Sequence, residues 1–575
     1  MSYGNSETHI DFFDTIFGEG VLSMVLIGKK HKFGLLQFRD VVFKDTRVEI
    51  CPEASEDLQK TRGFIDFLLK NDIAVYGVTT GLADLRNRKV NPLEAAQFSC
   101  NLIESHDAGI GIPLPQDVTL GAMIARASSL AKGSSGFQLK SLETLVDMIN
   151  NRIIPQIPKT GSLGASGDLA FLARMARAMK GDAVAVWYKN TTMTAREALE
   201  ITGIKPFEPL AKEGVAIANG TSFIISMLSI AYLQELNELE NILALQGLFL
   251  NAIGSLSTAF NENIHRVRNH SGQVLVAEVL SKHLEFSSFS DPSRIQDDYC
   301  IRCVPQIFGP KIEIILEQHK KIETELNAVT DNPLFFRGDE ISSDVDPSRI
   351  WSVNNELWTV LSGGNFHGEC LTTVVDTICT ANAKIAYTLE RQISYMLNPY
   401  RNRNQLPIYL ITNTSQSGLL SGYMITQYTA NALVQRIAQL GTPTSIYNIT
   451  SGNEAEDIVS YGSTAAERLL EQLQYLRELN AVYLTVAVQA YAITREKHLS
   501  TGKTISPSLL AEQIFGKIQD ITEEEYPTSK EENFEKRYTQ ALKVLDTGIL
   551  QSIMENPLYS QIMGEESAFV QLPSI

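Results

Sequence analysis

The chain has 575 residues, and its 49 basic and 66 acidic side chains give it a formal net charge of −17. The hydrophobic fraction of 44% is normal for a globular protein and excludes a wholly disordered chain. An acidic surface repels phosphate backbones, so we expect no nucleic acid partner.

The six cysteines are too few for a disulfide scaffold in a chain of this length. Cys300 and Cys303 form a CxxC motif, but no second CxxC completes a four-cysteine zinc site, so we expect no metal. The first residues lack the basic and apolar regions of a signal peptide. Together these features predict a cytoplasmic protein.

The N-terminal part of the chain shows mixed patterns. Residues 1–36 have no clear period and form a predicted N-terminal extension. Residues 39–41 suggest a short strand pair, and 55–70 suggest a helix after it. The run Ala-Val-Tyr-Gly-Val-Thr-Thr-Gly at 74–81 predicts a loop that follows a short extended piece. From 93 to 175, helical segments alternate with Gly- and Pro-rich breaks.

Two stretches without charged residues, 214–234 and 241–261, are long enough to span a membrane. They contain Asn, Gln, Gly and Ser residues, and no cluster of Lys and Arg flanks them to set an orientation. We therefore expect buried helices of a bundle and no membrane partner.

Long helices dominate the prediction for the rest of the chain. Because long apolar helices need mutual burial, the sequence predicts a mainly α fold with a long central helical bundle and a small mixed N-terminal region. The predicted long helices cover 224–260, 312–327, 369–396, 418–440 and 465–497, the last with an apolar period near 3.6 residues. The predicted regions are the N-terminal extension at 1–36, an N-terminal region with a Gly-rich motif at 37–215, the central helical bundle at 216–500, and a helical and polar C-terminal region at 501–575.

Residues 161–170, Gly-Ser-Leu-Gly-Ala-Ser-Gly-Asp-Leu-Ala, are the most unusual segment. Asp168 precedes the apolar run 169–179 and is placed to cap a helix there. One interpretation is a Gly-rich turn that binds an anion at this helix N-terminus. A nucleotide P-loop is excluded, because the sequence has no GxxxxGK followed by Ser or Thr.

A second interpretation of the same segment is chemical. In a tight Ala165-Ser166-Gly167 bend, the nitrogen of Gly167 can attack the carbonyl of Ala165, and Ser166 can lose water to leave an exocyclic methylidene. Glycine tolerates the dihedral angles that such a bend requires. The product, a 4-methylidene-imidazol-5-one (MIO), is an electrophile that accepts an amine and needs no external cofactor.

With these residues the sequence resembles the family of ammonia-lyases and aminomutases that carry the MIO group. The resemblance runs from about residue 37 to 500, with the family's motifs in their order. The matching segments are 76–81, 101–111, 161–169, 212–214, 219–222, 296–303, 327–333, 363–368 and 456–457. The resemblance implies an all-α homotetramer with sites built from several chains and a small amino acid substrate.

The resemblance assigns catalytic roles outside the Ala-Ser-Gly segment. Tyr76 matches the family's mobile-loop tyrosine, its proposed base, and the alternative is a packed loop tyrosine. Asn219 matches the asparagine that hydrogen-bonds the prosthetic ring, where a donor stabilises negative charge on the ring oxygen. The alternative for Asn219 is a satisfied helix-terminus residue. Tyr299 matches the tyrosine of the family's Tyr-x-x-Arg pair.

The resemblance also implies substrate-binding residues. Arg302, the arginine of that pair, can hold the substrate carboxylate bidentately, or else make a structural salt bridge. Gln296 and Phe366 match pocket-lining positions, although Phe366 could equally be a core aromatic. His106, in a Ser-His pair, matches the side-chain selectivity position and can hydrogen-bond an imidazole or a phenol. Glu456 resembles the acidic residue of histidine lyases, where aromatic lyases usually have Gln.

Several departures from the family pattern leave alternatives open. Leu82-Ala83 replaces a usual Phe-Gly pair after Tyr76, and alanine restricts positive φ angles. Residues 337–361 insert a Trp-containing segment, and the run 453–457 has an extra residue that leaves the alignment of Glu456 open.

The sequence therefore predicts an enzyme that eliminates ammonia from an aromatic or heteroaromatic L-amino acid, and it narrowly favours histidine, with urocanate as product. A tyrosine ammonia-lyase, or a tyrosine or phenylalanine 2,3-aminomutase that gives a β-amino acid, is the alternative. A catalytically dead family scaffold is the remote one.

Overall fold

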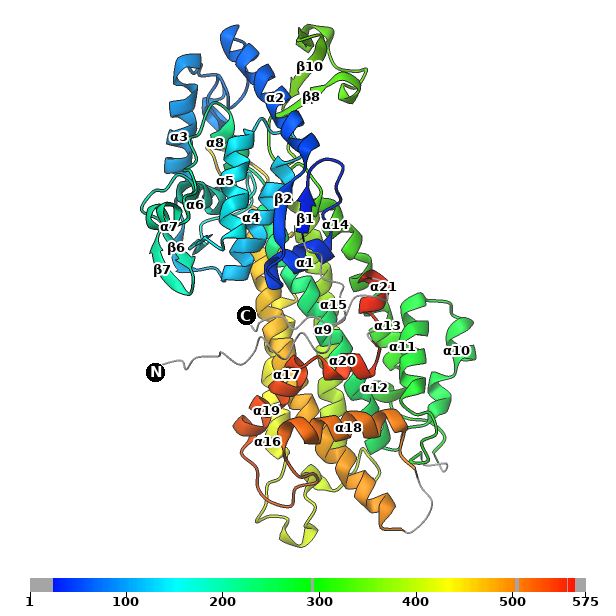
Figure 1. The fold of residues 1–575 in the computed structure, drawn as a ribbon. Helices are drawn as coiled ribbons and strands as arrows, with labels where there is room; N and C mark the ends of the chain where they lie inside the picture. Colours follow the sequence, from blue (N-terminus) through cyan, green and yellow to red (C-terminus); the bar gives the residue numbers. More distant parts are fainter. Residues whose placement is uncertain (1–23, 291–293, 502–505, 556, 564–575) are drawn as a thin grey trace. The chain divides into compact units, whose positions relative to one another are not determined.

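The computed structural model describes residues 24–290, 294–501, 506–555 and 557–563. They form two compact units, each assembled from separate segments of the chain. The first unit comprises segments of 1–230, 320–374 and 444–467, and the second comprises segments of 231–319, 375–443 and 468–575. Helices predominate in both units (Figure 1), so the predicted mainly α fold class is confirmed.

The helices of the first unit surround several small sheets. These helices are α1 (Leu35–Phe43), α2 (Pro52–Lys70), α3 (Ala95–His106), α4 (Gln116–Leu130), α5 (Leu139–Asn150), α6 (Leu169–Met179), α7 (Ala195–Thr202), α8 (Glu213–Ala218) and most of α14 (His319–Leu326). Helix α6 has the bounds that the apolar run predicts. By contrast, residues 39–41, expected in a strand, lie in α1. The buried residues Leu35, Phe38, Val41 and Val42 follow a helical period, which outweighs the local β propensity.

The strands of the first unit form small sheets. Strands β1 (Met24–Ile27) and β2 (Arg47–Ile50) pair in parallel, and β3 (Ile110–Pro113) pairs antiparallel with β5 (Pro158–Thr160). A three-stranded sheet has the order β4 (Ile154–Pro155), β6 (Ala185–Tyr188), β7 (Thr191–Thr194). These sheets supply the small mixed character predicted for the N-terminal part of the fold.

The Trp-containing insertion also folds as a sheet. Its strands have the order β8 (Leu334–Arg337), β10 (Glu356–Leu361), β9 (Trp351–Val353). Trp358 of β10 is only 3% exposed, and its ring stacks on that of Phe64 in α2 with centroids 5.1 Å apart. Figure 1 shows β8 and β10 beside α2. The insertion therefore extends the core of the first unit.

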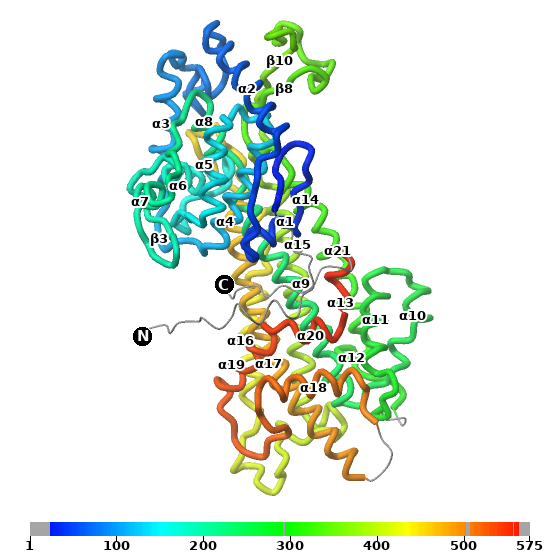
Figure 2. The backbone as a smooth tube through the Cα atoms, in the orientation of Figure 1, coloured from blue at the N-terminus to red at the C-terminus, as the bar shows by residue number. Residues whose placement is uncertain are grey.

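Three long helices, α9 (Ser222–Ala252), α15 (Glu369–Leu397) and α17 (Gly462–Leu499), lie mostly in the second unit and run side by side (Figures 1 and 2). Buried polar groups join them: Nε2 of Gln246 donates to Gln392 at 2.9 Å, and the hydroxyl of Tyr483 donates to Gln392 at 2.7 Å. The other helices of this unit are α10 (Glu262–Arg266), α11 (Ser271–Lys282), α12 (Tyr299–Arg302), α13 (Val304–Glu317), α16 (Met424–Leu440), α18 (Leu509–Thr522), α19 (Phe534–Asp546), α20 (Ile549–Ile553) and α21 (Tyr559–Met563).

Helix α9 contains only part of each stretch without charged residues. The stretch 214–234 begins in α8, and the stretch 241–261 extends beyond the end of α9. Within the described ranges, no helix combines the length and the apolar character that crossing a membrane requires. The single helix predicted at 312–327 is instead two, α13 and α14, which meet at Gln318.

Candidate active site

A cavity of about 270 Å³ in the first unit brings together residues that lie far apart in the sequence. Six predicted site residues line it: Tyr76, His106, Ser166, Asn219, Phe366 and Glu456. Its other lining residues are Leu82, Ala83, Leu102, Leu169, Val215, Ala218, Asn332, Ser362 and Gly363. Ala165 and Gly167, on either side of Ser166, are buried. We call this the Ser166 cavity.

The Ala-Ser-Gly segment is a tight loop held against the backbone of Gly220. Gly167 has φ of +77°, and a Cβ atom there would lie 2.2 Å from the carbonyl oxygen of Gly220. The amide of Asp168 donates to that same oxygen at 2.7 Å. Only glycine at 167 allows this close backbone approach, because any side chain would collide with Gly220.

Asp168 occupies the N-cap position of α6, but its side chain does not cap that helix. Its Oδ2 instead accepts hydrogen bonds from the amides of Phe223 at 2.8 Å and Ile224 at 3.1 Å, in the first turn of α9. Burial raises the pKa of Asp168 to about 7, and these amide hydrogen bonds oppose that rise. The prediction that Asp168 caps α6 is therefore wrong: its side chain instead binds the first turn of a helix more than fifty residues further along the chain and fixes the loop to α9.

Asn219 is fixed by bonds from two sides. Its Nδ2 donates to the carbonyl oxygen of Ser166 at 2.8 Å, and its own carbonyl oxygen accepts from Nη1 of Arg126 at 2.9 Å. Its Oδ1 is buried and has no hydrogen-bond partner among the described residues. A donor from a side chain that is only 6% exposed is thus held on the Ser166 carbonyl, and such low exposure strengthens the interaction.

The carboxylate of Glu456 faces the same loop. Its Oε1 accepts from the hydroxyl of Ser166 at 3.0 Å, and its Oε2 accepts from the hydroxyl of Ser451 at 2.8 Å. Glu454, two residues earlier, is exposed and does not line the cavity. Of these two glutamates, only Glu456, the residue whose alignment the sequence left open, lines the Ser166 cavity.

His106 is the last residue of α3 and lines the cavity. Its Nδ1 lies 2.9 Å from the carbonyl oxygen of Leu102 and 3.1 Å from Oγ of Ser105. Because a carbonyl oxygen can only accept, Nδ1 carries the proton, and Nε2 of the neutral ring is an acceptor. Burial lowers the pKa of His106 and favours this neutral ring, while the Leu102 carbonyl and the Glu456 carboxylate act in the opposite direction.

Tyr76 is half-buried, and its hydroxyl oxygen accepts a hydrogen bond from the amide of Ala83 at 3.1 Å. Ala83 has φ of +45°, in the left-handed region that the alanine substitution was expected to disfavour. Such a backbone conformation costs roughly 1–2 kcal/mol for a residue other than glycine. The next residue, Asp84, accepts a hydrogen bond from Asn453, which precedes the Glu456 loop. The tyrosine loop is therefore held by specific contacts despite the unfavourable alanine.

Gln296, Tyr299 and Arg302 line a different cavity, of about 720 Å³, in the second unit. Tyr299 is 69% exposed, and the guanidinium of Arg302 lies 4.8 Å from the centre of its ring. Nε of Arg302 is buried and has no hydrogen-bond partner among the described residues. These three side chains do not line the Ser166 cavity, so the structure divides the predicted site residues between two cavities.

Asn332 lines the Ser166 cavity, although the sequence assigned its side chain no role. Its Oδ1 accepts from the amide of Gly363 at 2.6 Å. The preceding Asp331 is fully buried, and its carboxylate pairs with Lys212 at 2.7 Å. Lys212 and Asp331 both lie in segments that match the family pattern. They are 119 positions apart, and no local sequence pattern shows that their side chains meet.

One group of three potential metal ligands, His31, Cys51 and Glu53, has its ligand atoms within 4.8 Å of one another in the described part of the chain. None of them lines the Ser166 cavity. All six cysteines are free thiols.

Comparison with known proteins agrees with this geometry. A sequence model of the family described as aromatic amino acid lyase matches residues 34–513. The histidine ammonia-lyase of Alkaliphilus oremlandii is 36% identical over 478 residues, which cover 82% of this chain and 89% of that protein. The structure of the Trypanosoma cruzi histidine ammonia-lyase matches with a TM-score of 0.79 at 27% identity, covering 96% and 99% of the two chains. The structure of the Streptomyces globisporus tyrosine aminomutase matches with a TM-score of 0.80 at 26% sequence identity, and the match covers 92% of this chain and 98% of that one.

The family match spans most of the sequence, and the segments that carry the Ala-Ser-Gly loop, Asn219 and Glu456 all fall within it. The chain therefore belongs to the aromatic amino acid lyase family.

Proposed function

We propose that this protein is a histidine ammonia-lyase, which removes ammonia from L-histidine and leaves urocanate. The observation that carries the proposal is the position of Glu456 and His106, which line one cavity with Ser166. The similarity to proteins named histidine ammonia-lyase, at 35–36% identity over most of the chain, supports the same choice. We also propose a cytoplasmic location, from the cysteine usage of the sequence.

The two groups suit an imidazole side chain. Glu456 offers a carboxylate, and neutral His106 offers Nε2, so both are acceptors. An imidazolium ring has two N–H donors and can satisfy both acceptors. A phenol has one O–H and would leave one acceptor unpaired, which costs free energy in a buried site.

The residues at 165–167 fit an MIO group. Gly167 has the positive φ and the close contact with Gly220 that a compact bend requires, and Asn219 donates to the oxygen of Ser166 that would belong to the ring. Such a group supplies an electrophile for the amine of the substrate. Asn219 would hold negative charge on the Ser166 oxygen. Loss of the Ser166 hydroxyl as water would also leave Oε1 of Glu456 free to accept from the substrate.

Two further roles complete the proposal. Tyr76, with its oxygen oriented by the amide of Ala83, acts as the base: in its phenolate form it takes the β-proton of the substrate and becomes the neutral phenol. Arg302 binds the substrate carboxylate through its guanidinium group. Because Arg302 and Tyr299 belong to the second unit, we propose a homotetramer in which they complete the site of another subunit.

The test of substrate choice is incubation of the purified protein with L-histidine, L-tyrosine and L-phenylalanine separately, followed by analysis for unsaturated acids and β-amino acids. We expect urocanate from L-histidine as the main product. Coumarate or β-tyrosine as the main product would instead favour a tyrosine lyase or aminomutase, in which His106 binds a phenol, and would overturn the histidine assignment.

The test of the prosthetic group is the intact mass of the chain. Formation of the group removes two molecules of water, and we expect this loss in the parent chain and not in Ser166→Ala. A parent chain with the full mass of its sequence would overturn both the lyase and the aminomutase proposals and leave a catalytically inactive scaffold.

A further inference from the structure

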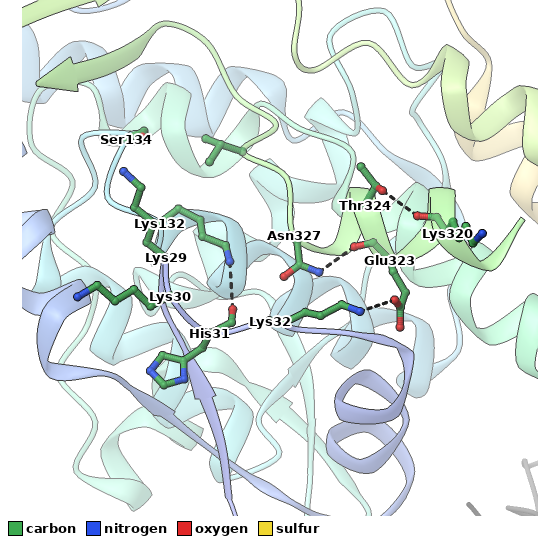
Figure 3. Close-up of a pocket in the computed structure, with 11 residues that line it drawn as sticks. Lys29, Lys30, His31, Lys32, Lys132, Ser134, Lys320, Glu323, Thr324 and Asn327 are labelled. Carbon is green, nitrogen blue, oxygen red and sulfur yellow. Dashed lines mark hydrogen bonds and ion pairs between the residues drawn. The ribbon is translucent and has the colours of Figure 1, made fainter. Parts of the chain in front are cut away.

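A second cavity of the first unit, of about 740 Å³, is surrounded by lysines (Figure 3). Its basic lining residues are Lys29, Lys30, Lys32, Lys132 and Lys320. We call it the lysine pocket. It shares no lining residue with the Ser166 cavity, and its residues come from the segment after β1, the turn after α4 and the segment that begins with α14. Five positive charges converge here in a chain whose net charge is −17.

Two of these lysines already have acidic partners. Lys29 forms an ion pair with Glu340, and Lys32 forms one with Glu323 at 2.7 Å. Lys30 and Lys320 form no ion pair within the described residues. The carboxylates of Glu53 and Glu56 interact with Lys30 only at longer range. The pocket therefore keeps an excess of positive charge that its own carboxylates do not neutralise.

Lys132 adds a buried cation. It is 8% exposed, and its Nζ donates to the carbonyl oxygens of Gly28 at 3.1 Å and His31 at 3.4 Å, as Figure 3 shows for His31. An ammonium group has three N–H donors, so one remains for a ligand. Burial lowers the pKa of Lys132, because a buried ammonium group whose hydrogen-bond partners are neutral carbonyls is unfavourable. An anion in the pocket would offset that cost.

The remaining lining residues restrict the kind of anion. They are His31, Ser134, Glu323, Thr324, Asn327 and Val329, and none offers a phenyl or indole face on which a nucleobase could stack. The volume suits a small molecule. Clustered ammonium groups are point charges that bind phosphate well. The acidic surface elsewhere disfavours a long polyanion. We propose that the lysine pocket binds a compact anion with adjacent phosphate groups, at a site separate from the Ser166 cavity.

The test uses inorganic pyrophosphate as the probe and isothermal titration of the full chain at physiological ionic strength. We expect one binding site per chain. The double variant Lys30→Ala/Lys320→Ala removes the two lysines without ion pairs and should weaken pyrophosphate at least about tenfold, because charge-assisted bonds to phosphate are among the stronger polar contacts. Citrate, which carries carboxylates in place of phosphates, should bind more weakly than pyrophosphate.

The matched control is Lys70→Ala/Lys321→Ala. Both of its lysines are exposed, neither lines the pocket, and Lys321 neighbours Lys320 on α14. This variant has the same net charge as the test variant and should retain the affinity of the parent. Equal weakening in both variants would reflect overall charge alone and overturn the proposal, as would no binding to the parent or equal affinity for citrate. Because the readout is binding, the result does not depend on which amino acid the enzyme uses.

Discussion

At the level of single residues, the proposed choice of histidine as substrate rests mainly on Glu456, which lines the Ser166 cavity. Its two oxygens accept from Ser166 and Ser451, and it is close enough to His106 to influence the protonation of that ring. Dehydration of Ser166 would remove one of these donors. The freed carboxylate oxygen would then be satisfied by the ring of a bound substrate, since a buried acceptor without a partner is costly.

Glu456→Gln tests this role. The amide keeps the shape but loses the charge, and a hydrogen bond to a charged group contributes about 1.5–3 kcal/mol. We therefore expect kcat/KM for L-histidine to fall about 10- to 100-fold, while the intact mass still shows the loss of two waters. Glu454→Gln, at the exposed position two residues earlier, is the control and should leave kcat/KM unchanged. Unchanged kinetics in Glu456→Gln would refute the assignment of substrate recognition to this residue.

The geometry of the loop around Ser166 is set by residues outside the cavity. The carbonyl oxygen of Asn219 accepts from the guanidinium of Arg126, and Gly167 lies against the backbone of Gly220. Neither Arg126 nor Gly220 lines the cavity. Ala83 keeps a left-handed conformation and donates to Tyr76. Alanine at this position therefore adds a backbone cost to a loop in which the amide of residue 83 still donates to Tyr76.

At the scale of elements, helix α9 is largely apolar but contains three buried glutamates, Glu235, Glu238 and Glu240. Glu235 is fully buried, its Oε2 accepts from Nδ2 of Asn382 at 2.7 Å, and its Oε1 has no hydrogen-bond partner among the described residues. Burial raises the pKa of Glu235 from 4.5 to about 8; the charge of Glu238 adds to this rise, and the bond from Asn382 opposes it. The folded protein therefore holds this carboxyl in its neutral form at neutral pH.

This shift predicts a pH dependence of stability. Because the folded-state pKa lies above the unfolded one, the folded state binds the proton more tightly. The contribution of Glu235 to stability is thus most favourable below about pH 4.5 and is lost as the pH rises through about 8. The side chain of Glu235→Gln cannot ionise. This variant should therefore have the Tm of the parent near pH 5 and a higher Tm near pH 9, where its free energy of unfolding should exceed the parent's by about a few kcal/mol.

Calorimetric scans at pH 5, 7 and 9 measure this difference. Glu278→Gln, at an exposed position on α11, provides the control and should track the parent at every pH. A Tm difference between Glu235→Gln and the parent that stays constant with pH would contradict the prediction.

At the scale of the whole molecule, the predicted site residues belong to two units. Ser166 and Asn219 lie in the first unit, whereas Tyr299 and Arg302 lie in the second. In the proposed homotetramer, one chain supplies the Ser166 cavity and another supplies Arg302. Such a shared site makes activity a property of the assembly.

Mixed oligomers test this arrangement. Ser166→Ala and Arg302→Ala homomers should each be nearly inactive, but co-expression should restore activity to about a quarter of the parent's, since random assembly pairs intact groups from different chains at one site in four. Co-expression of Ser166→Ala with Asn219→Ala is the matched control. Both groups belong to one cavity of one chain, so no activity should return. Failure of the first pair to complement would argue against shared sites.

Much of the fold was accessible from the sequence because its signals are local. Helices α6, α15 and α17 were predicted within a few residues, since their apolar periods lie within the elements themselves. Helix α1 and the sheet of β8, β9 and β10 were not predicted, because their stability comes from partners elsewhere in the chain. The packing of Trp358 on Phe64 is such a case.

The sequence by itself determined the family pattern, the long helices and the chemistry open to Ala165-Ser166-Gly167, because these depend on residue type and short spacing. Only the tertiary structure decided that Asp168 caps α9, that Glu456 and not Glu454 faces Ser166, and that scattered lysines meet in one pocket. These are contacts between residues far apart in the chain. They depend on how the backbone brings elements together, which no local period records.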